Sequence, residues 1–270
     1  MNEKQRFFAE LAFDGSKYHG WQIQQNALSV QEVFNKALAV LLRQSVETVG
    51  CGRTDTGVHA RQLFVHFDRA ISYQPSAISD LQLETRQVLM ADSSKLTAAL
   101  NAILPKDIAV KNIIPVAADA HARFDATLRA YEYHVHFGKD PFKQNYSWQL
   151  RDFPDLELMN QAANIIKEYQ DFSCFSKSNT QVKTNFCVIK EALWRQNPDE
   201  SLVFYIAADR FLRNMVRAIV GTLISVGKKE IGPEAVRKII ESKNRSNAGV
   251  SVPACGLYLM EVKYPYIPSN

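Results

Sequence analysis

The spacing of apolar residues predicts alternating strands and helices through the first 116 residues. The expected elements are strands at 6–14, 47–49, 62–68 and 108–116 and helices at 30–42 and 94–104. Ser29 and Glu32 form a capping box that opens the first helix. Residues 70–93 show no period and are interpreted as a surface excursion. The order β-α-β-β-α-β is typical of a ferredoxin-like unit.

The second half alternates in the same way. The expected elements are strands at 131–137, 186–195, 202–209 and 256–265 and helices at 155–169 and 210–227. The helix at 210–227 has the strongest pattern, because its apolar residues cover about 220° of the circumference, and it should be largely buried. Arg213 and Arg217 lie at the border of this apolar stripe. There a guanidinium either snorkels to water or meets a carboxylate.

Composition and cysteine spacing favour a globular protein of a reducing compartment. The 270 residues are 46% apolar, lack an apolar run long enough to span a membrane and begin without a secretory signal. The cysteines Cys51, Cys174, Cys187 and Cys255 are widely spaced, which favours free thiols in a reducing cytosol over disulfides or a zinc site. Net charge is +4, yet residues 205–245 alone hold nine Lys or Arg against four Asp or Glu, a net +5. Such a local excess of positive charge favours binding to an anionic polymer.

Residues 50–60, with the sequence GCGRTDTGVHA, form a polar loop between two predicted strands. We call it the Asp55 loop. Gly50, Gly52 and Gly57 permit positive φ and close backbone approach. A tight turn would need the same residue types, so the local pattern is compatible with either a turn or a site built around Asp55.

Two further segments gather aromatic and titratable side chains. In residues 15–29, Tyr18, His19 and Trp21 lie between glycines, which suits either base stacking or a loop folded onto its own core. Residues 121–137 could be an ordinary strand with aromatic packing or a basic, aromatic surface for RNA. The relevant side chains there are His121, Arg123, Arg129, Tyr131, Tyr133, His134 and His136.

Taken together, several segments resemble one family, tRNA pseudouridine synthase A. They are Tyr18–Gln24 (YHGWQIQ), Gly52–His59 (GRTDTGVH), His121–Phe124 (HARF), Arg129–Tyr133 (RAYEY), Phe211–Arg217 (FLRNMVR) and Gly256–Leu259 (GLYL). The resemblance extends from about residue 7 to residue 265. Thr56 departs from the family, in which alanine is commoner, but it neighbours the carboxylate without replacing it.

The resemblance implies an isomerase that converts uridine to pseudouridine at positions 38, 39 and 40 of the tRNA anticodon stem-loop. It implies a cytoplasmic homodimer that binds tRNA and uses no cofactor and no metal ion. The implied fold is α+β, with two ferredoxin-like α/β halves whose mainly antiparallel sheets join into one central sheet around an active-site cleft. We expect the halves to be residues 1–117, with the Asp55 loop, and 118–270, with the tyrosine strand and the arginine helix.

The same resemblance assigns roles to individual residues. Asp55 corresponds to the nucleophile, Tyr131 to the ring that contacts the target base, and Arg217 to the arginine paired with the aspartate. Arg53 is expected to bind the substrate and Leu257 to line the base pocket. The expected tRNA contacts are Ala120, His121, Ala122, Arg123, Phe124, Asn179, Thr180, Gln181, Val182 and Lys183.

The chemistry makes sense of these residue types. Exchanging a C–N glycosidic bond for a C–C bond calls for an ionised carboxylate, and a nearby arginine favours the charged form. Arg217 is the expected partner because it lies deeper in the predicted helix, whereas Arg213 is expected to meet solvent or phosphate. Whether Asp55 adds to C6 of the ring, attacks C1′ of the ribose or acts through a glycal stays open.

Other functions would need other residues. A glycoside hydrolase normally uses two carboxylates, and a metal-dependent nuclease needs clustered acids, whereas the Asp55 loop offers one. An RNA-binding module without catalysis would explain the basic and aromatic segments and would not need Asp55.

Overall fold

The computed structural model describes residues 4–70, 81–176 and 184–268, which form one nine-stranded sheet with helices packed against it. The strands are β1 (Lys4–Phe13), β2 (Val49–Gly50), β3 (His59–Ala70), β4 (Ile108–Val116), β5 (Leu128–Phe137), β6 (Trp148–Leu150), β7 (Ile189–Gln196), β8 (Leu202–Ala208) and β9 (Leu257–Lys263). The α-helices are α1 (Val30–Leu42), α2 (Leu81–Ile103), α3 (Leu156–Ile166), α4 (Met215–Gly227) and α5 (Ala235–Glu241). Short 3₁₀ turns lie at Gly15–Lys17, Ser173–Phe175, Arg245–Asn247 and Ala254–Gly256.

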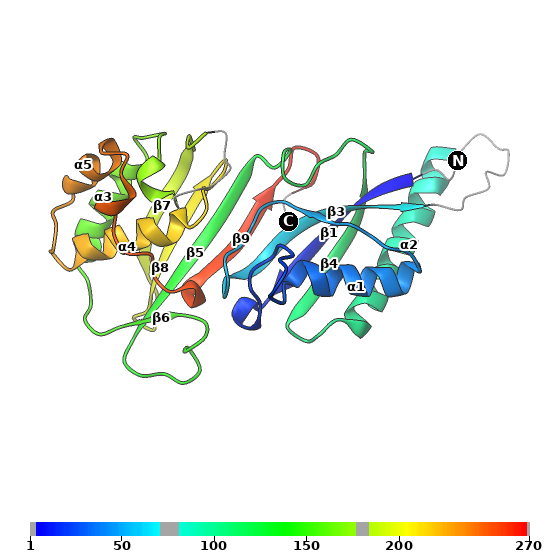
Figure 1. Cartoon of the computed structure of the whole chain (residues 1–270), viewed down its shortest axis with the longest axis horizontal. Coiled ribbons are helices and arrows are strands. Elements are labelled where there is room, and N and C mark those ends of the chain that lie inside the picture. Colours follow the sequence, from blue (N-terminus) through cyan, green and yellow to red (C-terminus); the bar gives the residue numbers. More distant parts are fainter. Residues whose placement is uncertain (1–3, 71–80, 177–183, 269–270) are drawn as a thin grey trace.

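The main sheet has the order β4-β1-β3-β9-β5-β8-β7 and runs along the long axis of the molecule (Figure 1). In the N-terminal half, β1 pairs antiparallel with β3 and β4, and β2 pairs antiparallel with β3. In the C-terminal half, β5 pairs antiparallel with β8 and β9, and β7 pairs antiparallel with β8. Leaving out the short β6, which pairs parallel with β5, each half has the ferredoxin-like order fourth, first, third, second, and the predicted fold class is confirmed.

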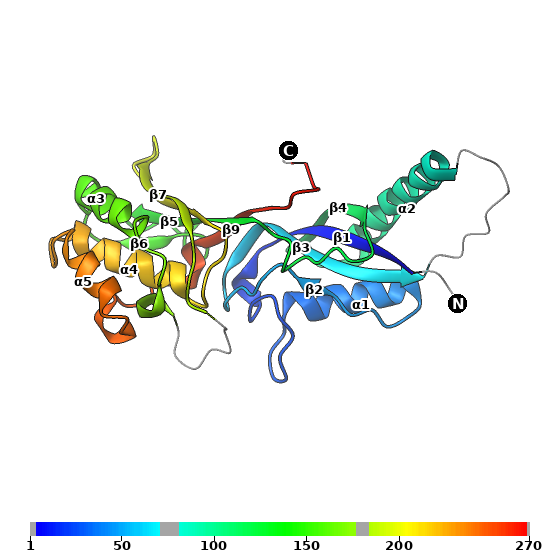
Figure 2. The same cartoon turned by 90° about the horizontal axis from the view of Figure 1, so that it is seen from above.

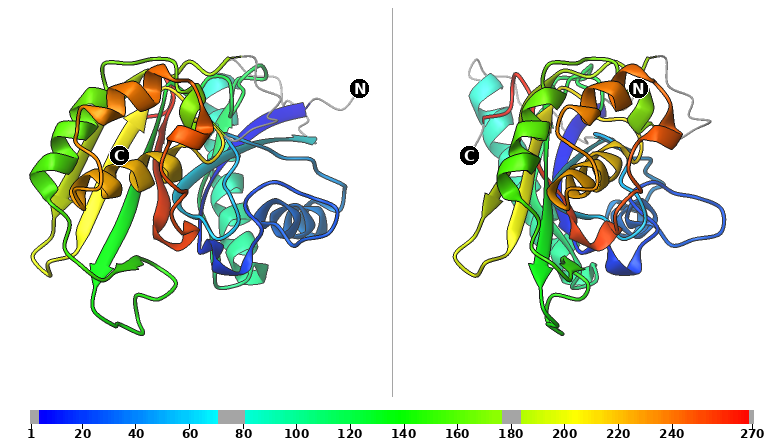
Figure 3. Two further views of the ribbon diagram at one scale, coloured as in Figure 1. Left: turned by 60° about the vertical axis from the view of Figure 1, so that its left-hand side comes forward. Right: turned by 90° about the vertical axis from the view of Figure 1, so that its left-hand side faces the viewer.

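The two halves meet where β3 and β9 run parallel, through the residue pairs His59–Tyr258 and Ala60–Leu259. We call this junction the seam. Figures 1 and 2 show α1 and α2 at one end of the sheet and α3, α4 and α5 at the other, with β9 in the middle. Figure 3 turns the C-terminal half forward and shows its three helices gathered over the strands. A domain boundary between residues 117 and 118 stays a prediction.

Most buried apolar side chains belong to one of two clusters, each centred on one half, although β9 residues such as Leu259 and Val262 belong to the N-terminal cluster. One cluster lies between the N-terminal sheet and its helices and includes Phe8, Phe34 and Phe64. The other lies between the C-terminal sheet and its helices and includes Phe204 and Val220. Burial of the α1 stripe follows its period, and the Ser29 hydroxyl accepts a hydrogen bond from the Glu32 amide as the capping box requires.

Several element boundaries differ from the sequence-based expectation. The second helix begins at Leu81 instead of residue 94, so the later part of the expected 70–93 excursion is helical; residues 71–80 lie outside the described part of the chain. The third strand begins at His59 instead of residue 62, because its first residues pair with β9. The strand before the Asp55 loop is short, with β2 limited to Val49 and Gly50.

The arginine helix, α4, begins at Met215 instead of residue 210. Asn214 has a φ of 66°, a left-handed conformation that cannot continue a right-handed helix backwards. Phe211 therefore precedes the helix, although it fits the apolar period, and Arg213 precedes the helix as well.

Within the described residues, none of the helices combines the length and apolar character needed to cross a bilayer.

Candidate active site

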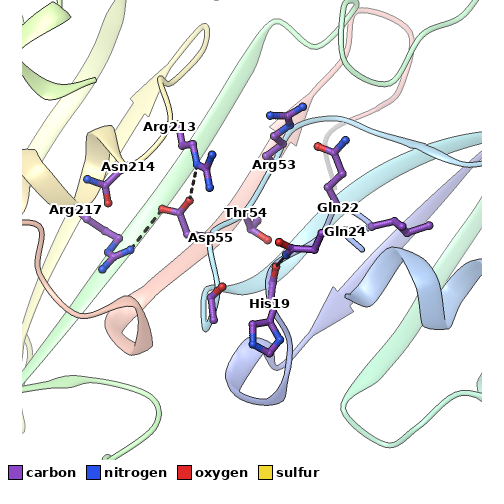
Figure 4. Close-up of a pocket in the computed structure, with 11 residues that line it drawn as sticks. His19, Gln22, Gln24, Arg53, Thr54, Asp55, Arg213, Asn214 and Arg217 are labelled. Carbon is purple, nitrogen blue, oxygen red and sulfur yellow. Dashed lines mark hydrogen bonds and ion pairs between the residues drawn. The ribbon is translucent and has the colours of Figure 1, made fainter. Parts of the chain in front are cut away.

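A pocket of about 460 Å³ lies between the two halves, near the seam (Figure 4). Three segments supply its walls: the Asp55 loop, residues 19–24 after β1, and the residues around the start of α4. Its lining residues are His19, Gln22, Ile23, Gln24, Arg53, Thr54, Asp55, Thr56, Arg213, Asn214 and Arg217.

Residues 18–21 pack against the Asp55 loop and hold it in place. The Trp21 amide donates to Thr54 Oγ1 at 2.9 Å, and the Gly57 amide donates to the Tyr18 carbonyl at 3.2 Å. Gly20 has a φ of +82°, and a Cβ there would lie 2.2 Å from the Thr54 carbonyl oxygen. Only glycine allows this approach, so the two segments behave as one unit.

Asp55 points between two arginines (Figure 4). Arg217 Nη1 lies 3.5 Å from Asp55 Oδ2, and Arg213 Nε lies 3.8 Å from Asp55 Oδ1. Both are ion-pair distances. The Arg217 side chain is 21% exposed and the Arg213 side chain 51% exposed.

Arg217 is also anchored within its own half. Its Nε donates to the Val252 carbonyl at 2.7 Å, and the Val252 amide in turn donates to the Arg217 carbonyl at 3.3 Å. The expectation that Arg213 meets only solvent or phosphate is corrected, because Arg213 also reaches Asp55. The reason is that Arg213 lies in the turn before α4 and not on the helix.

Arg53 is exposed at the rim of this pocket, whereas Tyr131 and Leu257 are not among its lining residues. Tyr131 lies on β5, with its ring edge-on to Phe211 at 5.2 Å between centroids. Burial raises the pKa of Tyr131, and the charge of Asp55 adds a small part. Leu257 is buried at the start of β9, opposite Tyr133 on β5.

Residues 120–124 divide into buried and exposed members. Ala120 and Ala122 are buried, whereas Arg123 and Phe124 are exposed, with 75% of Phe124 accessible. His121 supports this arrangement, because its Nδ1 accepts from the Arg123 and Phe124 amides and its ring lies 4.3 Å from that of Phe124. Arg123 and Phe124 are therefore the members free to meet a ligand. The expected contacts at residues 179–183 lie outside the described part of the chain.

A continuous basic surface along residues 121–137 is not formed. Arg129 donates to four backbone carbonyls, His136 is buried, and His134 pairs with Glu132 at 3.1 Å. Tyr133 is fully buried, and its hydroxyl donates to the Pro253 carbonyl. Most of this strand therefore follows the alternative of ordinary packing.

The positive charge of residues 205–245 is balanced in part by acids elsewhere in the chain. Lys229 lies 3.3 Å from Asp155, and Lys243 lies 2.9 Å from Asp171. The lysine of each pair is exposed, so each pair adds little to stability. They do, however, reduce the basic excess available to a polyanion on that face.

Of the two interpretations of the aromatic residues near position 20, base stacking or packing onto the core, packing holds for two of them. Tyr18 and Trp21 are buried, at 4% and 2% exposure. Sequence reasoning did not assign His19, Gln22, Gln24 or Asn214 to the site, although all four line the pocket. The first three could have been assigned from their place in the YHGWQIQ segment, whereas no sequence feature pointed to Asn214.

In the part of the chain that the structure describes, no three His, Cys, Asp or Glu side chains group closely enough to hold a metal ion. The cysteines are free thiols; Cys51, Cys174 and Cys187 are buried.

Comparison with known proteins gives consistent matches. Residues 169–265 match the family model described as tRNA pseudouridine synthase. The tRNA pseudouridine synthase A of Bacteroides fragilis is 47% identical over 261 residues, which cover 97% of each chain. That of Bacteroides thetaiotaomicron is 49% identical over 97% of this chain and 91% of its own. That of Clostridium acetobutylicum is 37% identical over 94% of this chain and 97% of its own.

Proposed function

Because the chain belongs to the tRNA pseudouridine synthase A family, whose members are isomerases that form pseudouridine in tRNA, we propose that it acts on uridines 38, 39 and 40 of the anticodon stem-loop with Asp55 as the nucleophile. The observation that carries this proposal is the position of Asp55 in the pocket. Its carboxylate lies within 3.5 and 3.8 Å of two guanidinium groups from the other half of the molecule.

Each part of the site suits one requirement of the reaction. A carboxylate must approach the sugar and the ring of the uridine, and Asp55 lies between the two arginines with one side of it open to the pocket. The target nucleotide must leave its stack, which requires groups that hold the RNA backbone beside the pocket. Arg53 at the rim and Arg123 on the exposed 120–124 segment are suitable groups.

Tyr131 and Leu257 are proposed to contact the target base. Both lie on strands next to the seam, and the Tyr131 side chain is near enough to Asp55 to respond to its charge. The RNA-binding alternative without catalysis has no use for a carboxylate between two arginines, because it would repel phosphate.

The test is pseudouridine formation in tRNA by wild type and by Asp55→Asn. The variant should lose turnover and keep its fold and tRNA affinity, since the side chain retains its shape and loses only its charge. Asp152→Asn, an exposed aspartate outside the pocket, is the matched control and should be fully active. Pseudouridine formed by purified Asp55→Asn would reject the assignment.

We further propose that the protein works in the cytoplasm as a homodimer and needs neither a cofactor nor a metal ion. Light scattering should then give twice the 30.6 kDa of one chain. Dialysis against EDTA should leave the rate of pseudouridine formation unchanged.

A further inference from the structure

The guanidinium of Arg129 joins three segments of the chain that surround the pocket. Its Nη1 donates to the carbonyls of Ala126 at 2.9 Å and Asp209 at 2.7 Å. Its Nη2 donates to the carbonyls of Cys51 at 3.0 Å and Arg123 at 2.7 Å. These acceptors belong to the Asp55 loop, to the segment before β5 and to the connection between β8 and α4.

All four acceptors are backbone oxygens, so the contacts of Arg129 hold the main chain of these segments in place. Each Nη carries two hydrogens, and all four are used in these bonds. The planar fork needed for two-point phosphate binding is therefore occupied. Among the described residues, no carboxylate lies within ion-pair distance of Arg129.

Two of the bonded residues each lie four positions along the chain before a charged residue of the pocket. Cys51 precedes Asp55 by four residues, and Asp209 precedes Arg213 by four residues. Arg129 thus ties the start of the nucleophile loop in one half to the start of the arginine segment in the other. At the seam itself, β3 and β9 share two residue pairs, so strand pairing gives little further control of the distance.

We propose that Arg129 is a positioning residue for pseudouridine formation, which holds the Asp55 loop against the segment leading into α4 so that Asp55 stays between Arg213 and Arg217. The inference rests on the proposed function. It gives Arg129 no contact with tRNA.

The experiment compares wild type with Arg129→Ala, Arg129→Lys and the control Arg195→Ala, which removes a 59% exposed arginine from β7. The measurements are the single-turnover rate with enzyme in excess, the Kd for tRNA over a range of salt, and thermal unfolding. A displaced reacting group costs about 100-fold in rate, which is the loss expected for Arg129→Ala well below its unfolding temperature. Arg129→Lys should fall between, because an ammonium has three donors and no fork.

The salt dependence separates positioning from phosphate binding. The slope of log Kd against log salt should be the same in wild type, Arg129→Ala and Arg195→Ala. A slope that flattens by about one unit in Arg129→Ala, with a wild-type rate at saturation, would make Arg129 a phosphate ligand and overturn the inference.

Two further outcomes would also overturn it. A folded Arg129→Ala protein with the wild-type rate would do so, and if that variant does not fold, a folded Arg129→Lys protein with the wild-type rate would do the same. Wild type that forms no pseudouridine would reject the proposed function together with the inference. Active wild type alongside an equally active variant would reject the inference alone.

Discussion

Asp55 is held by two arginines of different character, and the difference decides what each substitution should do. Arg217 is closer, less exposed and anchored to the Val252 carbonyl, whereas half of the Arg213 side chain is exposed. Removing a preorganised charged partner from a sheltered site costs about 100-fold in kcat, and an exposed, mobile partner contributes less. Arg217→Ala should therefore lower kcat by about 100-fold and Arg213→Ala by about tenfold.

The same pair of variants makes a prediction for stability. The Asp55 side chain is 23% exposed and keeps one arginine when the other is removed, so neither variant leaves a buried, unpaired charge. The free energy of unfolding should fall by about 1 kcal/mol or less in Arg213→Ala. It should fall by about 1–3 kcal/mol in Arg217→Ala, because this variant also removes the donor to the buried Val252 carbonyl. Steady-state kinetics and urea unfolding measure both effects. A larger loss of kcat in Arg213→Ala would reverse the ranking.

His66 gives a residue-scale prediction about pH. It is 7% exposed on β3, and its Nδ1 accepts from the Ala122 amide at 3.1 Å. Burial, helped by the charges of Arg6 and His121 and opposed by Asp68, lowers the pKa of His66 to about 4. The unfolded chain, with a pKa near 6.5, therefore binds more protons between pH 6.5 and 4.

Stability should then decrease as pH falls through that window, by up to about 1.4 kcal/mol per pH unit from this histidine. His66→Asn keeps an acceptor for the Ala122 amide and removes the titration. Unfolding free energies measured between pH 4 and 7 should depend less on pH in the variant. Equal slopes in the two proteins would show that His66 does not carry the effect.

At the scale of elements, helices with an apolar stripe and a capping side chain were predictable. Ser29 and Asp155 each accept an amide of the first turn, and α1 and α3 begin right after them. A helix boundary that depends on a single dihedral angle could not be predicted. The start of α4 depends on the left-handed Asn214, which an apolar period cannot reveal.

The packing of residues 18–21 under the Asp55 loop predicts a difference between two glycines. Gly20 and Gly138 both have positive φ, but a Cβ at Gly138 meets nothing within 4 Å, whereas at Gly20 it meets the Thr54 carbonyl. Gly138→Ala should cost about 1 kcal/mol from backbone strain alone. Gly20→Ala should cost more and also lower activity, because the clash displaces the Asp55 loop. Thermal unfolding with a pseudouridine assay compares them, and equal results would remove the packing argument.

At the scale of the whole molecule, tRNA binding should weaken steeply with salt, because basic side chains displace counterions from the RNA backbone. The exposed Arg123 is the best-placed single contributor from the 120–124 segment. Arg123→Ala should flatten the slope of log Kd against log salt by about one unit. An unchanged slope in filter-binding measurements would exclude Arg123 from the RNA contact.

Sequence reasoning reached the fold and the centre of the site by different routes. Apolar periods identified the strands of both halves except the short β6, and a contiguous motif identified Asp55. The contribution of Arg213 could not be predicted, because it depends on where α4 begins and on how two separate halves meet. The pairing of β3 with β9 is a contact between residues about 200 positions apart, and no local pattern encodes it.

That pairing also sets an order of events when the chain is made. Synthesis proceeds from the N-terminus, so β1 to β4 leave the ribosome long before β9, which is the last strand of the sheet and yet lies at its centre. Until residues 257–263 emerge, the β3 edge beside His59 has no neighbour from the second half. A nascent chain therefore carries Asp55 long before residues 213–217 and β9 are available to complete the pocket around it.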